Sequence, residues 1–253
     1  MAPIRRRRFL ATLGGAGCVV VRLDAQLSGP TETLSKAERD RMTPAQVIDE
    51  LKKGNERFRS GTSTRQDYRK QQRASAEAQY PAAVVLGCID SRAPAEIIFD
   101  VGIGDTFNAR IAGNIVDDDL LGSLEFACSV AGAKAVLVLG HTACGAIKGA
   151  IDHVTLGNLT GLLAHIQPAV AATEFTGQRS SKNPAYVDAV ARTNVNHSID
   201  VLRRRSALLA DLEKEGKIQI AGAMYDLSTG VVDFVDVNGS PLRHTASPSH
   251  PQP

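Results

Sequence analysis

Short apolar runs alternate along this chain with amphipathic segments, an order typical of an α/β protein. The runs AAVVLG (82–87) and AVLVLG (135–140) have the length of buried parallel strands, and each ends in a glycine that permits a sharp turn. A further strand is predicted at 105–112. The segment 217–237 predicts two strands joined around residues 228–230. The pattern therefore predicts a central, mostly parallel β-sheet.

Helical patterns fill the intervals before and between these strands. Thr43 is followed by Pro44 and Gln46, an arrangement typical of a helix start, and Gly61 is the expected end. Because this helix stands ahead of the first strand, we expect it to form an N-terminal helical arm that packs on a partner subunit. Its apolar face carries Val47, Leu51 and Phe58, and Gly54 weakens it. Further helices are expected at 94–98, 117–132, 144–154, 161–175 and 184–213.

The first 26 residues have the pattern of an export signal. Four consecutive arginines (5–8) precede Phe9 and Leu10, and a short, weakly hydrophobic segment follows that is too short to span a membrane. Arg-Arg-x-Phe-Leu resembles the bacterial twin-arginine signal, which implies a periplasmic or secreted protein that is exported folded. Membrane attachment is expected only if Cys18, in a partial lipobox, carries a lipid.

Composition changes sharply between this segment and the rest of the chain. The formal net charge is +2, but residues 1–26 contain five arginines and one aspartate, so the remainder is close to −2. With no basic face left, no nucleic-acid partner is expected. Residues 27–42 are polar and predict a linker, 43–240 form one domain, and the Pro/Ser/His-rich 241–253 predict a disordered tail.

Candidate metal ligands follow the two central strands. Cys88 and Asp90 come directly after the first run, and His141 and Cys144 come after the second. The carboxyl ends of parallel strands meet at one sheet edge, and thiolate with imidazole is the donor set typical of zinc. Asp90 either takes the fourth ligand position or hydrogen-bonds a zinc-bound water. Arg92 is placed to hold Asp90 away from the metal.

Other interpretations of the cysteines and histidines are weaker. Four cysteines at these positions are too few for a disulfide framework, and the absence of a CxxC pair argues against a structural zinc or a redox site. Cys128 lies within a predicted helix and is expected to be a buried, inert thiol. The remaining histidines, which have no ligand-like spacing, are His153, His165, His197, His244 and His250.

At its two strand-end motifs the chain resembles the β-class carbonic anhydrases. CIDSR (88–92) and HTACG (141–145) match the family motifs C-x-D-S-R and H-x-x-C-G in order and separation, and the resemblance extends over roughly 43–237. It implies one zinc ion per chain, held by Cys88, His141 and Cys144. It also implies that Asp90 and Arg92 form the dyad that opens or closes the site.

The resemblance extends to substrate contacts and assembly. It implies a side-chain donor at Gln79, an apolar wall for carbon dioxide at Phe107 and Phe126, and a backbone contact at Gly145. Active sites of the family lie at a dimer interface, so a homodimer or a dimer of dimers is expected. Gln79 and Phe107 are then placed to act across subunits.

The activity implied is the reversible hydration of carbon dioxide to bicarbonate and a proton, by attack of zinc-bound hydroxide. Val85 stands where a bicarbonate-inhibited branch of the family has tryptophan, which favours the open arrangement with Asp90 on Arg92. Two alternatives stay open at this point. One is a carbonyl sulfide or carbon disulfide hydrolase of the same fold, and the other is a non-catalytic zinc-binding homologue.

Overall fold

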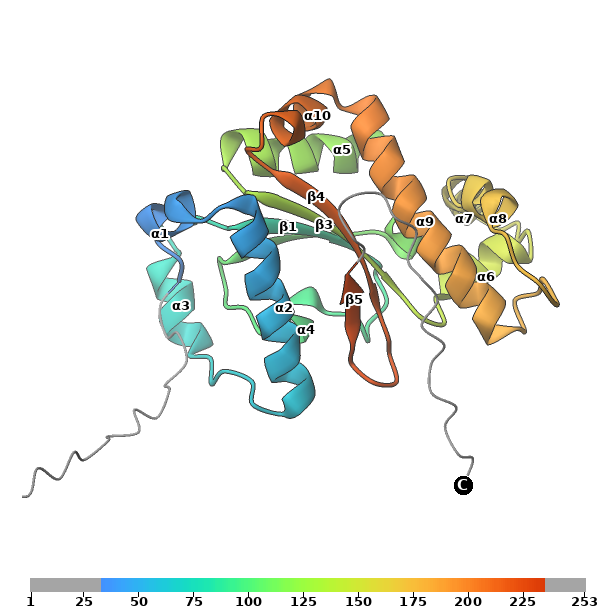
Figure 1. Ribbon diagram of the computed structural model, residues 1–253, viewed down its shortest axis with the longest axis horizontal. Coiled ribbons are helices and arrows are strands. Elements are labelled where there is room, and N and C mark those ends of the chain that lie inside the picture. The colour runs from blue at the N-terminus through green and yellow to red at the C-terminus, as the bar shows by residue number, and fades with distance from the viewer. Residues whose placement is uncertain (1–32, 235–253) are drawn as a thin grey trace, which may run out of the picture.

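Five strands form a single sheet in the order β2-β1-β3-β4-β5 (Figure 1). The computed structural model describes residues 33–234, so the predicted signal peptide, Cys18 and the predicted C-terminal tail lie outside the described residues. The first four strands are parallel and β5 is antiparallel to β4, which confirms the predicted α/β fold. Their bounds are β1 Ala83–Gly87, β2 Thr106–Arg110, β3 Ala135–His141, β4 Gln219–Tyr225 and β5 Val232–Phe234.

Helices cover both faces of this sheet (Figure 1). Along β1, alternating side chains send Val84 and Leu86 to one core and Ala83 and Val85 to the other. The first core lies under α5, α6, α9 and α10, and the second lies under α2 and α4. The helices are α1 Lys36–Arg41, α2 Pro44–Ser60, α3 Tyr68–Ala74, α4 Ala95–Ile98, α5 Asp118–Glu125, α6 Gly145–Ile151, α7 Gly157–Ala164, α8 Gln167–Ala172, α9 Pro184–Arg205 and α10 Ala207–Lys214, with a 3₁₀ turn η1 at Ala112–Asn114 and a π turn η2 at Phe126–Val130.

Helix α2 begins and ends where the sequence predicts. Thr43 and Gln46 form a reciprocal capping box, and Gly61 closes the helix with φ +69°. The apolar face of α2 lies on the sheet of its own chain, where Val47 and Leu51 are buried. Packing of the N-terminal arm on a partner subunit stays a prediction.

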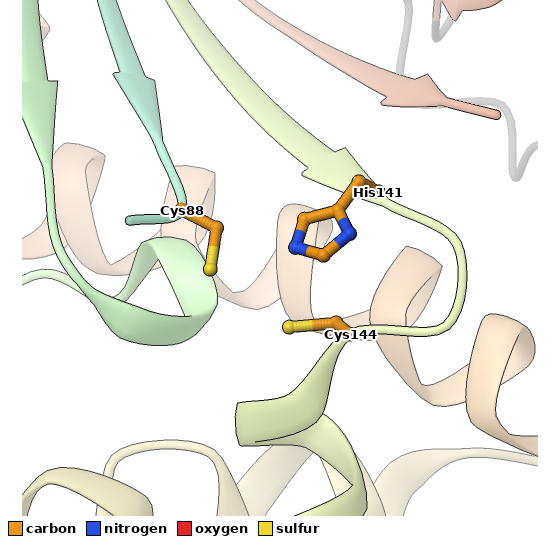
Figure 2. Close-up of side chains that lie close together, drawn as sticks. All are labelled: Cys88, His141 and Cys144. Atoms are coloured by element: carbon orange, nitrogen blue, oxygen red, sulfur yellow. The ribbon is translucent and has the colours of Figure 1, made fainter. Parts of the chain in front are cut away.

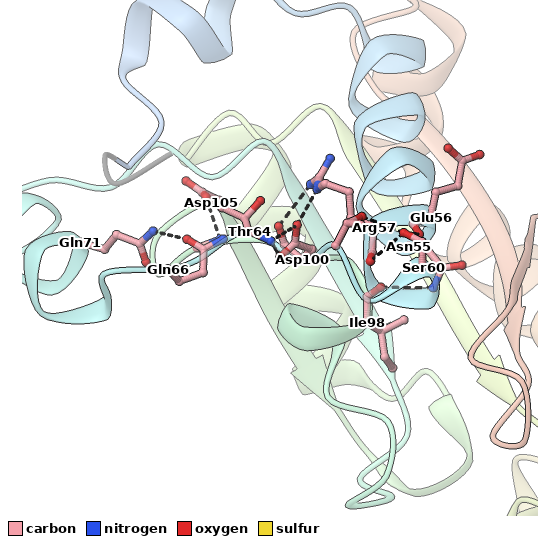
Figure 3. Close-up of polar contacts among 12 residues, drawn as sticks. Asn55, Glu56, Arg57, Ser60, Thr64, Gln66, Gln71, Ile98, Asp100 and Asp105 are labelled. Carbon is pink, nitrogen blue, oxygen red and sulfur yellow. Dashed lines mark hydrogen bonds and ion pairs between the residues drawn. The ribbon is translucent and has the colours of Figure 1, made fainter. Parts of the chain in front are cut away.

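A polar cluster anchors α2 to the rest of the chain (Figure 3). Asn55 donates to the carbonyl oxygens of Ile98 and Gly230, at 3.2 and 2.9 Å, and accepts from the Val232 backbone N–H at 2.9 Å. Arg57 pairs with the buried carboxylate of Asp100. The helix is therefore fixed by buried hydrogen bonds as well as by its apolar face.

The segment predicted as a linker contains a helix. Ser35 and Glu38 form a capping box at the start of α1, and the buried Arg39 donates to the carbonyl oxygen of Ala131. Residues 36–41 therefore fold onto the domain. Their polar composition hides this, because the helix is held by side chain–backbone bonds rather than by an apolar stripe.

Two segments predicted as single helices are each divided. The 161–175 segment forms α7 and α8, with Pro168 in the first turn of α8, where proline is tolerated. The 184–213 segment divides at Ser206, whose hydroxyl accepts from the Leu209 N–H and starts α10. Among the described residues, no helix combines the length and apolar character needed to cross a bilayer.

Candidate metal centre

Cys88, His141 and Cys144 converge at the carboxyl edge of the sheet. Strands β1 and β3 are neighbours, with Gly87 opposite Leu139, so Cys88 and His141 leave the sheet at the same edge. Cys144 precedes the first residue of α6. Figure 2 shows the three side chains pointing toward one another, and their candidate ligand atoms all lie within 4.8 Å. Each residue is at most 5 % exposed.

The orientation of His141 fits a metal ligand. Its Nδ1 lies 2.9 Å from the Thr142 carbonyl oxygen, which only accepts, so Nδ1 carries the proton. Nε2 is buried and has no hydrogen-bond partner among the described residues. A buried, unpartnered imidazole nitrogen beside two sulfurs is costly unless it meets a cation. The donor set of two thiols and one imidazole suits zinc.

Hydrogen bonds favour a thiolate at Cys88. The Cys144 thiol, as the largest cause, and the Gly113 backbone N–H lower the pKa of Cys88, and the Gly113 nitrogen lies 3.3 Å from its sulfur. The pKa of Cys144 is raised, first by its contact with Cys88 and then by burial. A divalent cation between the two sulfurs stabilises the ionised form of both.

Asp90 pairs with Arg92 beside this cluster. Arg92 Nε donates to Oδ1 at 2.9 Å and Nη2 donates to Oδ2 at 2.7 Å, so the carboxylate is held by two parallel bonds. The Arg92 contact is the main cause of a pKa of Asp90 held well below its usual range. Asp90 Oδ2 also lies 3.9 Å from His141 Nε2. The structure therefore has Asp90 next to the candidate ligands but bound to Arg92.

The loop that carries Cys88 and Asp90 is fixed from the edge strand β2. Arg110 donates to the carbonyl oxygens of Cys88 at 2.8 Å and Asp90 at 2.6 Å. Arg110 lies within the strand predicted at 105–112, but the sequence does not indicate that contact. Gly113, in the η1 turn, supplies the N–H that reaches the Cys88 sulfur. These three contacts join residues 20 to 25 positions apart in the sequence.

Most of the predicted substrate contacts do not adjoin the cluster in the single chain. Phe107 and Phe126 lie together, with ring centroids 6.3 Å apart at an interplanar angle of 64°. They line a hollow of about 540 Å³ whose lining does not include Cys88, His141 or Cys144. Gly145 follows a candidate ligand at the start of α6, and Gln79 is exposed between α3 and β1. In the single chain, only Gly145 directly adjoins the cluster.

Cys128 is separate from this centre. Its side chain is buried, and burial raises the pKa of its thiol to about 12. The structure therefore confirms the prediction that Cys128 is buried, and its raised pKa supports the prediction that the thiol is inert. Within residues 33–234, Cys88, His141 and Cys144 form the one group of three or more histidines, cysteines or acids close enough to share a metal ion.

Comparison with known proteins agrees with this geometry. The family model described as carbonic anhydrase matches residues 83–232. Carbonic anhydrase 2 of Mycobacterium tuberculosis is 37% identical over 182 residues, 71% of this chain and 87% of the relative. The carbonic anhydrase of Mycolicibacterium smegmatis is 37% identical over 186 residues, 73% of this chain and 89% of the relative.

Solved structures give the same result. A β-carbonic anhydrase of Sordaria macrospora, described as tetrameric, has a TM-score of 0.56 and 25% identity, covering 63% of this chain and 83% of its own. A β-carbonic anhydrase of Aspergillus fumigatus shares the fold with a TM-score of 0.59 and 23% identity, covering 76% of this chain and 90% of its own. The parallel sheet, the ligand cluster at its strand ends and the similar proteins place this chain in a class of α/β metalloenzymes. This chain belongs to the β-class carbonic anhydrase family.

Proposed function

We propose that this protein is a carbonic anhydrase that catalyses the reversible hydration of carbon dioxide to bicarbonate with one zinc ion per chain. One observation carries the proposal: a buried Cys88–His141–Cys144 cluster with the Asp90–Arg92 pair beside it. A purely structural metal site would not need the Asp90 carboxylate, which is held 3.9 Å from His141 Nε2. The carbonic anhydrases that this chain resembles support the assignment.

Zinc held by Cys88, His141 and Cys144 would supply Lewis acidity, which in carbonic anhydrases with three histidine ligands lowers the pKa of a coordinated water to about 7. Two thiolates carry more negative charge than imidazoles, so a somewhat higher pKa is expected here. The task of the protein is then to orient the nucleophile, admit carbon dioxide and exclude competing ligands.

Asp90 is suited to orient the nucleophile. Because Arg92 keeps its carboxylate ionised, Asp90 is an acceptor only, and it accepts a hydrogen bond from the attacking O–H. A lone pair of that oxygen is thereby directed at the carbon of the substrate. In the proposed dimer, Phe107 and Phe126 would offer an apolar wall for carbon dioxide, and Gly145 and Gln79 would offer hydrogen-bond donors for bicarbonate.

The decisive experiment compares Cys144→Ser with the unchanged protein. Serine is a poor zinc ligand, so the variant should hold well below one zinc per chain and lose carbon dioxide hydration in stopped-flow assays. Cys128→Ala is the matched control, because its thiol is buried away from the cluster, and it should keep both zinc and turnover. If Cys144→Ser binds one zinc per chain as tightly as the unchanged protein, the assignment of Cys144 as a zinc ligand is wrong.

The same zinc-loaded sample separates the alternatives. Carbon disulfide turnover without hydration of carbon dioxide would identify a sulfur-analogue hydrolase. Full zinc occupancy with neither activity would identify a non-catalytic homologue. The family comparison favours neither of these.

The chain is further proposed to act as a homodimer or a dimer of dimers. Phe126 is 53% exposed and Val130, also on η2, is 73% exposed, so this face carries apolar surface in the single chain. The Sordaria relative is tetrameric. Light scattering of the full chain, 26.9 kDa, should give a mass of at least twice that of one chain, and Phe126→Glu should lower it. Leu208→Glu, on an exposed site of α10, is the control that leaves the mass unchanged.

We also propose export of the folded protein to the periplasm. The arginines at 5–8 followed by Phe9 and Leu10 support a twin-arginine route. Folded export has a chemical reason, because unprotected thiols of Cys88 and Cys144 are prone to pair in an oxidising compartment. A double Arg6→Lys, Arg7→Lys variant should remain in the cytoplasm; unchanged export would contradict the proposal.

A further inference from the structure

The two residues between His141 and Cys144 decide how those side chains face each other. One of them, Ala143, has φ +55°, a left-handed conformation that L-residues with a side chain seldom adopt. Such a residue keeps this conformation only where its surroundings impose it. The contacts that impose it therefore belong to the working structure of the metal centre.

Hydrogen bonds from two elements hold this loop. From the β4 side, the Thr142 N–H donates to the Tyr225 carbonyl oxygen at 3.0 Å, and the Leu227 N–H donates to Thr142 Oγ1 at 3.0 Å. From α9, Asp188 Oδ1 accepts from the Ala143 N–H at 2.9 Å. The bond to Asp188 is the one that acts directly on the strained residue.

We propose that Asp188 is a positioning residue for the metal centre. Its carboxylate oxygen holds Ala143 in the left-handed conformation and so keeps His141 and Cys144 at the spacing that zinc requires. The inference rests on the proposed zinc site. It assigns a role to a residue 45 positions away from the loop that it holds.

The position of Asp188 on α9 strengthens the inference. Further along the same helix, the buried Asn194 donates to the Gly113 carbonyl oxygen at 2.8 Å, and Ser198 donates to the Asn114 carbonyl oxygen at 3.0 Å. Gly113 is the residue whose N–H reaches the Cys88 sulfur. One helix therefore contacts the loop beside Cys88 and the loop between His141 and Cys144.

Helix α9 is rigid enough for this task. It spans Pro184–Arg205, and Val187, Val190 and Val195 on its inner face are completely buried in the core of the sheet. Side chains on a packed helix hold a loop at a fixed distance better than contacts within the loop can. The spacing of polar residues along α9 thus sets the distance between the loop that carries His141 and Cys144 and the η1 turn whose Gly113 N–H contacts Cys88.

The test is the rate at which zinc leaves the protein in excess chelator. Losing a partner that orients a metal ligand typically costs about 10–100-fold in metal affinity, so Asp188→Ala should release zinc about 10–100-fold faster. Asp188→Asn keeps an oxygen acceptor at the same place and should release zinc almost as slowly as the unchanged protein. Asp200→Ala, an exposed aspartate on the same helix, is the matched control and should change nothing.

Cobalt substitution gives a second readout that does not depend on activity. The visible bands of bound Co²⁺ report ligand geometry, and they should shift in Asp188→Ala but not in Asp188→Asn or Asp200→Ala. Far-ultraviolet circular dichroism establishes that each variant is folded.

Each outcome bears on the inference. Zinc release from Asp188→Ala as slow as from Asp200→Ala, with unchanged cobalt bands, overturns the positioning role. Fast release from Asp188→Asn overturns the claim that the acceptor oxygen is what matters. If the unchanged protein holds no zinc, the proposed function and the positioning role both fail, whereas a failure confined to the variants refutes the positioning role alone.

Discussion

In the proposed mechanism, the pairing of Asp90 with Arg92 is the contact on which the chemistry most depends. The Asp90 side chain is 16% exposed and the Arg92 side chain 57%, so the guanidinium faces solvent while the carboxylate faces the cluster. Asp90 Oδ2 is 3.9 Å from His141 Nε2, within reach of a short movement toward the metal position. In the proposed mechanism, Arg92 therefore decides whether Asp90 orients the nucleophile or competes for the metal.

Replacing Arg92 by alanine tests this directly. Arg92→Ala should depress turnover, by something on the order of 100-fold, and retain one zinc per chain, because the freed carboxylate takes the fourth ligand position. Stopped-flow hydration and metal analysis of the same sample measure the two effects. Arg203→Ala, which breaks the surface pair with Glu213, is the control. If Arg92→Ala loses zinc together with activity, Arg92 has a structural role in the metal site instead.

Cys128 offers a second prediction for a single residue. Since burial raises the pKa of its thiol to about 12, very little thiolate exists at pH 8, and alkylation of the folded protein should be slow. Iodoacetamide labelling followed by peptide mass spectrometry should show at least about 100-fold slower modification of Cys128 in the folded than in the unfolded chain. Equal labelling rates of Cys128 in the folded and the unfolded chain would contradict the burial of this thiol.

Which site residues a sequence reveals depends on how local their signal is. Cys88, His141 and Cys144 follow recognisable strands, so the topology alone predicts that they meet. Asp188 and Gly113 are different, because their contributions arise from contacts with residues 45 and 25 positions away. No local pattern distinguishes Asp188 from any other aspartate on a helix.

Among the elements, α2 shows how tertiary packing reverses a local preference. The sequence marks Gly54 as a weak point in the helix. In the structure, a Cβ added at Gly54 would lie 1.8 Å from the carbonyl oxygen of Phe99, at the end of α4. Glycine is required there because the backbones of two elements approach closely.

Gly54→Ala should therefore destabilise the fold, although alanine is the better helix former. Overpacking of this kind costs about 1–3 kcal/mol in the free energy of unfolding, measured as a lower urea midpoint. Gly161→Ala is the matched control: this helical glycine of α7 is exposed and open, so it should gain about 0.5–1 kcal/mol. A more stable Gly54→Ala variant would contradict the close approach of α2 and α4.

The elements that the sequence predicts least well are those defined by caps rather than by apolar runs. The strands are predicted because buried parallel strands are continuously apolar. The break at Ser206 is hidden because apolar periodicity continues through it, and only the hydroxyl bond to Leu209 starts a new helix. Helix α1 is hidden for the opposite reason, since it has almost no apolar residues to reveal it.

At the scale of the whole molecule, the metal centre joins parts that fold from distant sequence. Cys88 follows β1, His141 ends β3 and Cys144 precedes α6, and the loops around them are held by β2, β4 and α9. A metal ion here links the centre of the sheet to a helix of one face. Binding should therefore stabilise the entire domain and not only the loops that contact the ion.

This gives a quantitative prediction for metal removal. Free zinc at 100 times its dissociation constant should raise the free energy of unfolding by about 2.7 kcal/mol, because the unfolded chain lacks the assembled ligands. For a domain of this size, each kcal/mol raises the melting temperature by about 2–4 °C, so the zinc-loaded protein should melt several degrees above the stripped protein in calorimetry. Cys144→Ser should abolish the difference and Cys128→Ala should preserve it. Identical melting of loaded and stripped unchanged protein would show that the cluster does not couple metal to the fold.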